Sequence, residues 1–541
     1  MNLSLLANLL SSLGTYFLEK QEEIFTQLAT HLWLTLASLF LAVLISVPLG
    51  IWISRKEKLA SLVLGFTNVL QTIPSIALLG FMIPLMGIGI APAITALFLY
   101  ALLPIVRNTY TGITEVDDSI TEAAKGMGMS PWQILGRVEL PLALPVIFAG
   151  IRTATVINVG VATLAAYIGA GGLGEFIFGG IALNDSQMIL AGAIPAALLA
   201  VLLDTFLGRI QLLPIRTLSY LVTTVMIIIP VGFAIQFFSE PKDQKFTAAF
   251  DPEFIGRLDG YPTLQETYGM DVNAKSMNTN LMYEAIFDER VDLISGYSTD
   301  GRIKAYDLAV LADDKAAFPP YDAAPIVHRG VYERFPEVIP VLNLLGGRIS
   351  DSAMIQLNYQ ADHLKREPDS IANAFLVDLK LIDKNGNAIP EIAAQLGGGF
   401  STSNEPFIIG SKNFTEQFIL IAIFKNLIET YTLRTVDLKA GLGGTKICFE
   451  ALRAEEIDLY PAYTGTGFGV MLGGDKALKD SLGGTSQDIL KYVDEQFNAQ
   501  FNVDWLEPLG FNNTYAIMMK KELAEEYNLK TLSDFVRVRK K

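Results

Sequence analysis

The residue types that usually carry out catalysis are few and scattered in this chain of 541 residues. Its three histidines, His31, His328 and His363, lie in unrelated stretches, and no nucleophile motif or cluster of metal ligands accompanies them in the sequence. The segment GLGGTKI at 441–447 lacks the GxxxxGK(S/T) spacing with which a P-loop holds phosphate. We therefore expect that the chain is not an enzyme, that it holds no cofactor or metal, and that any ATP hydrolysis belongs to another polypeptide.

Charge and composition are divided between two parts of the sequence. Nearly continuous apolar runs occupy residues from about 24 to 238, whereas the remainder has the mixed composition of a soluble α/β protein. The formal net charge is −15 at pH 7, and most of the acidic excess lies in the second part, so the sequence carries no basic footprint for nucleic acid. The single cysteine, Cys448, excludes an intrachain disulfide.

A membrane span needs about twenty apolar residues, and the first part of the chain offers six such runs. They lie near residues 27–53, 60–86, 90–106, 142–168, 188–210 and 217–238. Basic residues such as Arg55, Arg107 and Arg209 fall in alternate loops, which the positive-inside rule places in the cytoplasm. We expect an all-α polytopic membrane domain over residues 1–238, with everything after Phe238 on the extracytoplasmic side.

The stretch from Glu122 to Pro141, EAAKGMGMSPWQILGRVELP, falls in one of these cytoplasmic loops. Helix-forming residues come first, Gly126 and Gly128 interrupt them, and Ser130-Pro131 has the residue types that begin a new helix. This pattern predicts a helix-turn-helix surface on which another protein can act; the alternative is an ordinary amphipathic loop. The spacing resembles the cytoplasmic loop signature of permease subunits of binding-protein-dependent ABC importers, at Glu122, Ala123, Ala124, Gly128, Leu140 and Pro141. That family prefers isoleucine where this chain has Val138.

The resemblance implies a fold of about six transmembrane helices in a bacterial plasma membrane and a set of partners. Permeases of this type work in pairs, so two copies of this chain would join a dimer of ABC ATPase subunits. Those subunits would bind the ATP and magnesium that this chain does not bind. They would dock on the Glu122–Pro141 loop, on the opposite side of the lipid bilayer from the soluble part of the chain.

The sequence after Phe238 turns polar and then alternates strand and helix patterns. DLISGY at 292–297 and FIIGS at 407–411 have the pattern of buried strands, and TEQFILIAIFKNLIETY at 415–431 has apolar residues at helical spacing. This alternation predicts an α/β domain with mainly parallel strands. The segment Gly397–Pro406 has the composition of a flexible linker.

Six longer motifs stand out in this soluble part. They are DPEFIGRLDGYP at 251–262, GYSTDGRIKAYDL at 296–308, FPPYDAAP at 318–325, FIIGSKNFTEQ at 407–417, YPAYTGT at 460–466 and FNNTYA at 511–516. Together they resemble the substrate-binding proteins of the osmoprotectant class, which bind glycine betaine, choline, carnitine and related quaternary amines. The resemblance implies a two-lobed α/β domain of the periplasmic-binding-protein type, with the ligand between the lobes.

The order of these motifs differs from the family order, in which SKNFTEQ opens the domain and FPPYDAAP lies near its end. We therefore expect residues 239–245 to be a linker, 246–383 the C-terminal half of a binding domain, 384–406 a second linker and 407–541 the N-terminal half. This describes one complete, circularly permuted domain, a rearrangement that proteins tolerate at exposed loops. The alternative is two damaged tandem domains, neither of which could close a core alone.

The resemblance also assigns a ligand site. A quaternary ammonium has no hydrogen to donate, so aromatic faces must hold it by cation–π attraction. By their positions in the motifs, the cage residues are Tyr297, Tyr321, Tyr463 and Tyr515. The donors for a ligand carboxylate are Arg257, Lys412 and Thr466, and the planar fork of Arg257 suits a bidentate contact. Taken singly, each tyrosine would be packing and each cation a solvated charge.

One position departs from many relatives, which have glutamate where Ala462 stands in YPAYTGT. This difference bears on the identity of the ligand and on affinity rather than on the fold.

The sequence thus predicts the permease and substrate-binding subunit of an ATP-driven importer for a quaternary-ammonium osmoprotectant such as glycine betaine, carnitine or choline. Choline is the less favoured of these, because it has no carboxylate for Arg257 and Lys412. The alternative ligand is ergothioneine, a betaine of a thiol-imidazole. A membrane-anchored solute sensor is a further alternative, but it needs a cytoplasmic output segment that this sequence does not show.

Overall fold

The computed structural model describes residues 12–214, 217, 224, 246–272, 274–397, 405–432 and 434–539. These residues divide into two compact units. Unit 1 comprises most of the chain up to residue 245 together with a short segment at 275–278, and unit 2 comprises most of the chain after residue 245.

Unit 1 is built of apolar helices. Four of its described helical segments are long and apolar enough to cross a membrane: α2 (Gln21–Ile53), α5 (Ile90–Thr114), Pro131–Ile168 and α10 (Ser186–Ile210). The helices α3 (Glu57–Thr72) and α4 (Ser75–Met86) meet at a bend of 99° and make a fifth span if they are taken together. The prediction of an all-α membrane domain is confirmed, while the sixth expected span, 217–238, lies outside the described residues apart from two positions.

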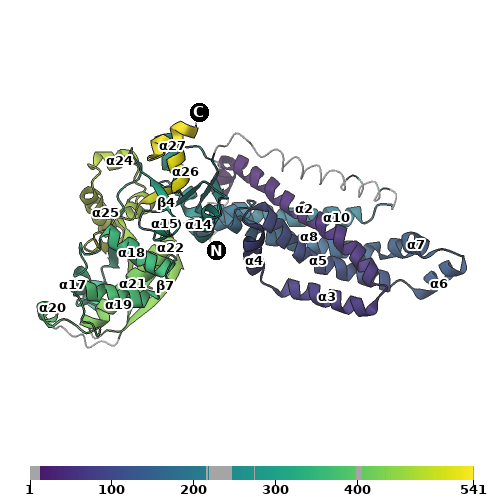
Figure 1. Ribbon diagram of the computed structural model, residues 1–541, viewed down its shortest axis with the longest axis horizontal. Helices are drawn as coiled ribbons and strands as arrows, with labels where there is room; N and C mark the ends of the chain where they lie inside the picture. The colour runs from purple at the N-terminus through teal and green to yellow at the C-terminus, as the bar shows by residue number, and fades with distance from the viewer. Residues whose placement is uncertain are drawn as a thin grey trace. The chain divides into compact units, whose positions relative to one another are not determined.

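Close approach of backbones holds this unit together. Helix α5 packs along both α2 and α8 (Leu140–Ala162), as Figure 1 shows. A Cβ atom added at Gly150 of α8 would lie 2.6 Å from the carbonyl oxygen of Pro104 in α5, so only glycine fits there. Small residues at helix contacts are what packing within a membrane requires, because lipid tails give helices no hydrophobic reason to associate.

The shorter elements of unit 1 lie between these spans. They are α6 (Asp118–Gly126), α7 (Pro131–Ile134), a π-helical turn (Leu135–Glu139), a 3-10 turn (Thr163–Ile168) and α9 (Gly174–Leu183).

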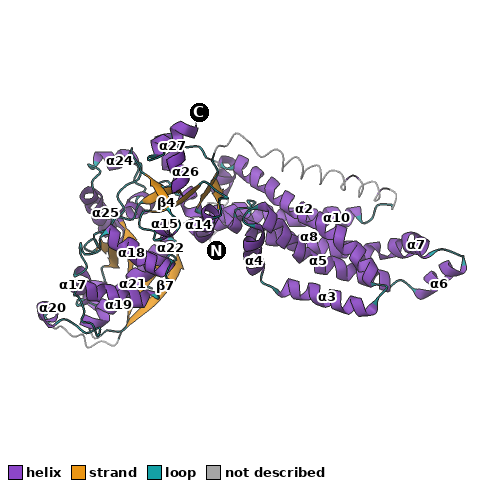
Figure 2. Cartoon of the chain, in the orientation of Figure 1, coloured by secondary structure: helices purple, strands orange, loops and turns teal. Residues whose placement is uncertain are grey.

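Unit 2 has two lobes, each built on a five-stranded sheet (Figure 2). The sheet of lobe 1 has the order β2-β1-β3-β10-β4. Its strands are β1 (Ala248–Phe250), β2 (Ala274–Ser276), β3 (Leu293–Tyr297), β4 (Leu308–Leu311) and β10 (Tyr515–Lys520). The sheet of lobe 2 has the order β7-β6-β8-β5-β9. Its strands are β5 (Ala323–His328), β6 (Phe407–Lys412), β7 (Val436–Gly443), β8 (Leu459–Tyr463) and β9 (Val503–Trp505).

Helices cover these sheets, and α21 (Thr415–Tyr431) is the most deeply buried of the longer ones. Its apolar residues Leu420, Phe424 and Leu427 are fully buried against the lobe 2 sheet and against α17, α18 and α19. The other helices of unit 2 are α12 (Pro252–Gly256), α13 (Tyr261–Tyr268), α14 (Thr279–Phe287), α15 (Arg302–Ala305), α16 (Val331–Arg334), α17 (Val338–Asn343), α18 (Asp351–Asp362), α19 (Pro368–Asp378), α20 (Pro390–Gln395), α22 (Thr445–Arg453), α23 (Thr464–Thr466), a π-helical turn (Gly467–Met471), α24 (Lys476–Ser481), α25 (Ser486–Phe501), α26 (Lys521–Glu526) and α27 (Leu532–Arg539).

The prediction of mainly parallel strands is wrong, because both sheets are mixed. Strand β10 pairs antiparallel with β3 and β4, and β5 pairs antiparallel with β8 and β9. The parallel pairs are β1 with β3, β6 with β7 and β6 with β8. The physical reason is that β5 and β10 follow the crossings of the chain from the other lobe. Strand β5 begins beside the residue at which β8 ends, and β10 begins beside the residue at which β3 ends, so each pair is antiparallel.

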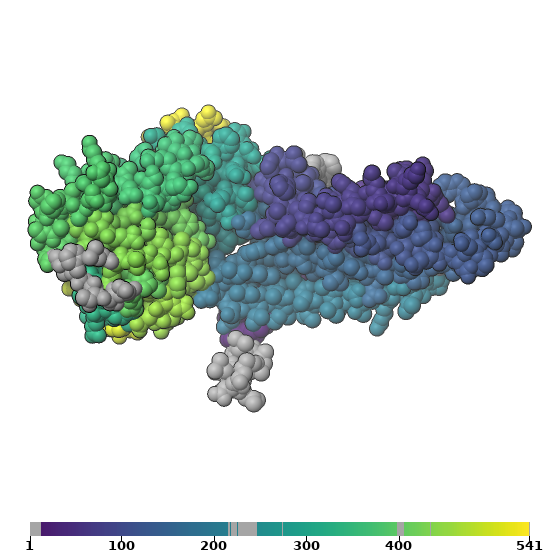
Figure 3. Space-filling view, turned by 90° about the horizontal axis from the view of Figure 1, so that it is seen from below, coloured from purple at the N-terminus to yellow at the C-terminus, as the bar shows by residue number. Residues whose placement is uncertain are grey.

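Both sheets draw strands from both halves of the soluble sequence. Strand β10 comes from the last part of the chain and lies between β3 and β4, which precede it by about 200 residues. Strand β5 likewise lies between β8 and β9, which follow it by more than 130 residues. In the space-filling view, green residues of the earlier segment and yellow-green residues of the later one lie against each other (Figure 3). The two segments therefore form one folded unit.

This shared architecture predicts that unit 2 survives a cut in its chain. We expect a protein with a protease site inserted within 398–404 to be cleaved without releasing the fragment that begins near residue 405. Strands β5 and β10 each pair on both sides with strands of the other fragment, so that neither sheet is complete without both. Gel filtration of the cleaved protein in detergent tests this.

The control is the same cleaved sample in denaturant, where the two fragments should separate. Release of the C-terminal fragment under native conditions would contradict the paired arrangement and favour two independent domains.

Candidate functional site

A pocket with an empty volume of about 410 Å³, its open mouth included, lies between the two lobes of unit 2. All seven ligand residues that the sequence predicts line it, from both lobes: Arg257, Tyr297, Tyr321, Lys412, Tyr463, Thr466 and Tyr515. The remaining lining residues are Glu253, Asn413, Phe414, Gly444 and Asn513.

Strand register explains why the tyrosines meet at this pocket. In lobe 1, Tyr297 is the last residue of β3 and lies directly opposite Tyr515, the first residue of β10. In lobe 2, Tyr463 ends β8 and lies opposite Ala323, the first residue of β5, two residues after Tyr321. Antiparallel pairing thus brings one strand end and one strand start to the same edge of each sheet, and the two edges face the pocket.

The aromatic rings form a connected series around the pocket. The ring centroid of Tyr515 lies 5.6 Å from that of Tyr321 and 5.5 Å from that of Tyr297. Phe414 continues the series, with its centroid 5.6 Å from Tyr297 and 6.4 Å from Tyr463. Burial raises the pKa of all four tyrosines well above the usual value, so their hydroxyls stay protonated at neutral pH. This surface is neutral, polarisable and suited to a cation without hydrogen-bond donors.

Arg257 is held by the protein's own carboxylates. Its Nε and Nη2 atoms donate to the two oxygens of Asp259 at 2.8 and 2.5 Å, and Nη1 donates to Glu253 at 3.0 Å. Nη2 also reaches Thr466 Oγ1 across the lobes at 3.3 Å, and the guanidinium carbon lies 5.3 Å from the centre of the Tyr515 ring. The bidentate fork that a ligand carboxylate would use is therefore occupied by Asp259.

Lys412 presents a different situation. Its ammonium is buried and lies 4.8 Å from the centre of the Tyr463 ring. No carboxylate of the described residues comes within 4.0 Å of it. Burial lowers the pKa of this ammonium to about 8, an effect that the charges of Glu253 and Asp259 only partly oppose. Among the two predicted cations, Lys412 is the one whose charge remains available.

Sequence reasoning missed several residues that shape the pocket. Phe414 completes the aromatic series, Asp259 and Glu253 hold Arg257, and Glu416 accepts a hydrogen bond from the Tyr463 hydroxyl at 2.6 Å. The signal that could have found them is their place inside the same motifs, DPEFIGRLDGYP and SKNFTEQ. A further residue, Ala462, is buried in an apolar cluster of lobe 2 and does not line the pocket.

The second candidate site is the Glu122–Pro141 segment of unit 1. Its predicted helix-turn-helix is confirmed: α6 ends at Gly126, and Ser130 forms a capping box at the start of α7 with Pro131 as the first helical residue. Gly128 has a φ of +78°, which favours glycine at the turn. Glu122 and Ala123 are exposed, Ala124 is buried, and Leu140 and Pro141 are half-buried at the start of α8.

The exposed face of this segment is apolar as well as charged. The side chains of Met127 and Trp132 are 75% and 82% exposed. At the far end of the segment, the buried carboxylate of Glu139 accepts two hydrogen bonds from Arg55, just after α2. The segment is thus tied to the membrane helices at its C-terminal end while its turn is left exposed.

Comparison with known families covers both units. Residues 234–378 and 405–541 match the family described as the substrate-binding domain of the ABC-type glycine betaine transport system. Residues 42–220 match the family described as the inner membrane component of binding-protein-dependent transport systems.

Individual relatives match the membrane part. The osmoprotectant import permease protein OsmW of Salmonella typhimurium is 54% identical over 186 residues, which are 34% of this chain and 86% of that protein. The carnitine transport permease protein OpuCB of Listeria monocytogenes is 46% identical over 202 residues, 37% of this chain and 93% of that protein. The glycine betaine/carnitine/choline transport system permease protein OpuCB of Bacillus subtilis is 45% identical over 199 residues, 37% of this chain and 92% of that protein.

The Arg257–Asp259 pair yields a stability prediction. Arg257→Met leaves two carboxylates without their cation, one of them (Asp259) buried, and removing one partner of a buried ion pair costs about 3–5 kcal/mol. We expect the variant to lower the free energy of unfolding of unit 2 by that order, measured by hydrogen exchange of unit 2 peptides in increasing denaturant.

The matched control is Arg257→Met with Asp259→Asn, which removes both charges. It should recover a large part of the loss, whereas a double variant no more stable than Arg257→Met would show that the unpaired Asp259 carboxylate is not the source of the destabilisation.

Proposed function

Because this chain belongs to the substrate-binding domains of glycine betaine transport systems and to the binding-protein-dependent membrane permeases, we propose that it is the permease and receptor subunit of an ATP-driven importer. Its solute is a quaternary-ammonium osmoprotectant such as glycine betaine, carnitine or choline. The observation that carries this proposal is one pocket with five aromatic rings and a buried ammonium that no carboxylate of the described residues neutralises.

The two ends of a betaine fit different parts of this pocket. The series of rings from Tyr321 to Tyr463 offers faces to the quaternary ammonium, each worth roughly 0.5–2 kcal/mol. Lys412 offers a charge to the carboxylate, and the buried Tyr515 hydroxyl, which has no hydrogen-bond partner among the described residues, can donate to an oxygen. We assign Arg257 to holding Glu253 and Asp259 in place rather than to the ligand. Thr466 remains a carboxylate donor in this proposal.

Other ligands and roles remain as alternatives. Choline has no carboxylate, so unpaired positive charges in the pocket would repel it. Because Glu253 and Asp259 pair with Arg257, only Lys412 remains to repel choline, which makes choline a better candidate than the sequence alone indicated. Ergothioneine, a betaine with an additional thiol-imidazole, would use the same rings and the same ammonium. A solute sensor without transport is the third alternative. The exposed turn at Glu122–Pro141 weighs against it, because in permeases such a loop is the surface on which the ATPase docks.

The partners follow from the permease family. Two copies of this chain assemble with a dimer of ATPase subunits, which bind ATP and magnesium and press on Glu122, Ala123 and the exposed turn around Gly128. The chain lies in a bacterial plasma membrane, with unit 2 on the extracytoplasmic side. ATP binding moves the loop, and unit 2 delivers its solute to the outward-open pathway.

The binding domain is circularly permuted in this proposal. Residues 246–383 supply what is the C-terminal half in related receptors, 407–541 supply the N-terminal half, and the linkers are 239–245 and 384–406. The pairing of β10 with β3 and β4, and of β5 with β8 and β9, supports one complete domain rather than two damaged ones.

The pKa of Lys412 predicts how pH affects ligand choice. A carboxylate ligand stabilises the charged ammonium, so its affinity should be constant below pH 8 and fall as pH rises through about 8, approaching tenfold per unit at higher pH. Choline should bind no more weakly at pH 9.5 than at pH 7, because loss of the positive charge removes a repulsion. Calorimetry of the full chain in detergent with glycine betaine, carnitine, choline and ergothioneine measures this.

Two variants control this experiment. Lys412→Met should abolish the pH dependence and weaken betaines more than choline, whereas Tyr297→Ala should weaken all of these cations. Tight choline binding with no response to any betaine would contradict the carboxylate assignment, and a Tyr297→Ala protein with full affinity would contradict the cage.

The coupling role of the loop is tested separately. Glu122→Lys reverses an exposed charge on α6 without touching a buried group, so the protein should fold and bind ligand normally. After reconstitution with its ATPase in liposomes, we expect ligand-stimulated ATP hydrolysis to be lost. Glu115→Lys, an exposed charge reversal outside the loop signature, is the control. Normal coupling in the Glu122→Lys protein would refute the role of the loop.

A further inference from the structure

Glu416 is a buried carboxylate beside the pocket that no cation among the described residues neutralises within 4.0 Å. It lies in the first turn of α21 in lobe 2 and accepts four hydrogen bonds. Oε1 accepts from the Tyr463 hydroxyl at 2.6 Å and from Asn513 Nδ2 at 2.8 Å. Oε2 accepts from Thr299 Oγ1 at 2.6 Å and from Asn358 Nδ2 at 3.0 Å.

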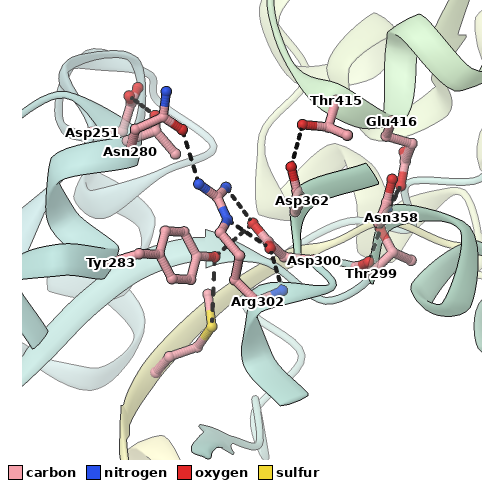
Figure 4. Close-up of polar contacts among 12 residues, drawn as sticks. Asp251, Asn280, Tyr283, Thr299, Asp300, Arg302, Asn358, Asp362, Thr415 and Glu416 are labelled. Carbon is pink, nitrogen blue, oxygen red and sulfur yellow. Dashed lines mark hydrogen bonds and ion pairs between the residues drawn. The ribbon is translucent and has the colours of Figure 1, made fainter. Parts of the chain in front are cut away.

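These four partners come from both lobes and from a segment that crosses between them. Tyr463 belongs to the aromatic series and Asn358 to α18, both in lobe 2. Thr299 follows β3 in lobe 1, and Asn513 lies in the segment that crosses between the lobes, just before β10. Asn358 also donates to the backbone oxygen of Thr299 at 2.9 Å, a second bond across the lobes. Figure 4 shows Thr299, Asn358 and Glu416 converging at this point.

The hydrogen-bond geometry suits an ionised Glu416. A carboxylate has about four acceptor positions and no donor, and here two amide NH2 groups and two hydroxyls that can donate lie at those four positions. Burial raises the pKa of this carboxyl, and the hydrogen bonds from Thr299, Tyr463, Asn358 and Asn513 oppose that rise. If the lobes separate, Glu416 loses the hydrogen bond from the Thr299 hydroxyl, while its carboxylate stays in lobe 2.

Several contacts hold the lobe 1 side of the Thr299–Glu416 hydrogen bond. Asp300, next to Thr299, accepts from Arg302 Nε at 3.0 Å and Nη2 at 2.7 Å, and from the Tyr283 hydroxyl at 2.7 Å. The guanidinium carbon of Arg302 lies 3.8 Å from the centre of the Tyr283 ring. These contacts among Tyr283, Asp300 and Arg302, labelled in Figure 4, hold the loop that presents Thr299 to lobe 2.

We propose that Glu416 is a positioning residue that links the ligand cage to closure of the lobes. It fixes the hydroxyl of the cage residue Tyr463 with one oxygen and closes on Thr299 of the other lobe with the second. We call this set of contacts the Glu416 latch. The latch favours the closed arrangement of the lobes and slows escape of any ligand held against Tyr463. The proposal rests on the proposed function only in taking a betaine as the ligand probe.

The test uses Thr299, which is part of the latch but does not line the pocket. Thr299→Val keeps the shape of the side chain and removes the hydroxyl that donates to Glu416, and Thr299→Ser restores a hydroxyl. A hydrogen bond to a charged group changes an equilibrium by about ten- to a hundredfold. We expect Thr299→Val to speed glycine betaine dissociation from the full chain by that factor with little change in the association rate, and Thr299→Ser to stay near the wild-type rate.

The matched control is Thr415→Val. Thr415 is the residue before Glu416, and its hydroxyl donates to Asp362 at 2.6 Å, the same length as the Thr299 bond, but both partners belong to lobe 2. This variant should leave dissociation unchanged. Glu416→Gln is a second probe: its amide would face two of the four donors, so closure and binding should both weaken.

Lobe closure is measured without ligand as well. Cysteines introduced at the exposed residues Glu289 of lobe 1 and Lys491 of lobe 2 carry a fluorescent pair, while the buried Cys448 is shielded from labelling. Thr299→Val should shift the distance distribution toward the open form, and Thr299→Ser and Thr415→Val should not. An unchanged distribution and an unchanged dissociation rate in Thr299→Val would overturn the latch. If wild type bound no betaine, the proposed ligand would fail, and the distance distribution would still decide the latch.

Discussion

The entry of two strands from the opposite lobe fixes the geometry of the binding unit. Strands β5 and β10 each begin at the cleft, directly after the chain has crossed from the other lobe, and each runs antiparallel to a strand that ends there. The pairing of Tyr297 with Tyr515 is a direct consequence, as is the position of Tyr321 near Tyr463. A shift of one residue in either register would turn alternate side chains to the other face of the sheet. The cage therefore depends on backbone pairing before it depends on any side-chain contact.

The buried charges around this cage are stabilised in three different ways. Arg257 is surrounded by carboxylates, Glu416 is surrounded by neutral donors, and Lys412 has an aromatic face. Desolvation penalises each charge, and the first two are compensated by hydrogen bonds within the protein. The compensation of Lys412 is the weakest, which is why its pKa falls to about 8. A group whose charge is least well compensated by the protein gains most from a ligand of opposite charge.

Local sequence patterns were sufficient to predict the elements that depend only on their own residues and not on which other elements they pack against. The apolar runs marked the long helices, helical spacing marked α21, and serine and proline marked the start of α7. Periodicity could not show that β5 and β10 are antiparallel, because strand direction is set by the connection and not by the residues of the strand. The meeting of Arg257 with Thr466, more than 200 residues apart in sequence, was accessible only through the resemblance of whole motifs.

The site was harder to predict than the fold because one side chain can serve two purposes. Arg257 has the fork that suits a carboxylate ligand, and the sequence placed it at the pocket, yet Asp259 two residues away occupies that fork. The spacing of Arg257 and Asp259 in the sequence does not predict this pairing. Both residues lie in an irregular loop between α12 and α13, where no helical or strand periodicity determines the direction of the side chains. The same holds for Glu416, whose partners lie on four separate segments. Where the protein supplies its own counter-charge, the residue type alone does not show whether a charged side chain contacts the ligand or another protein side chain. Only the position of the protein group that can pair with that side chain distinguishes the two.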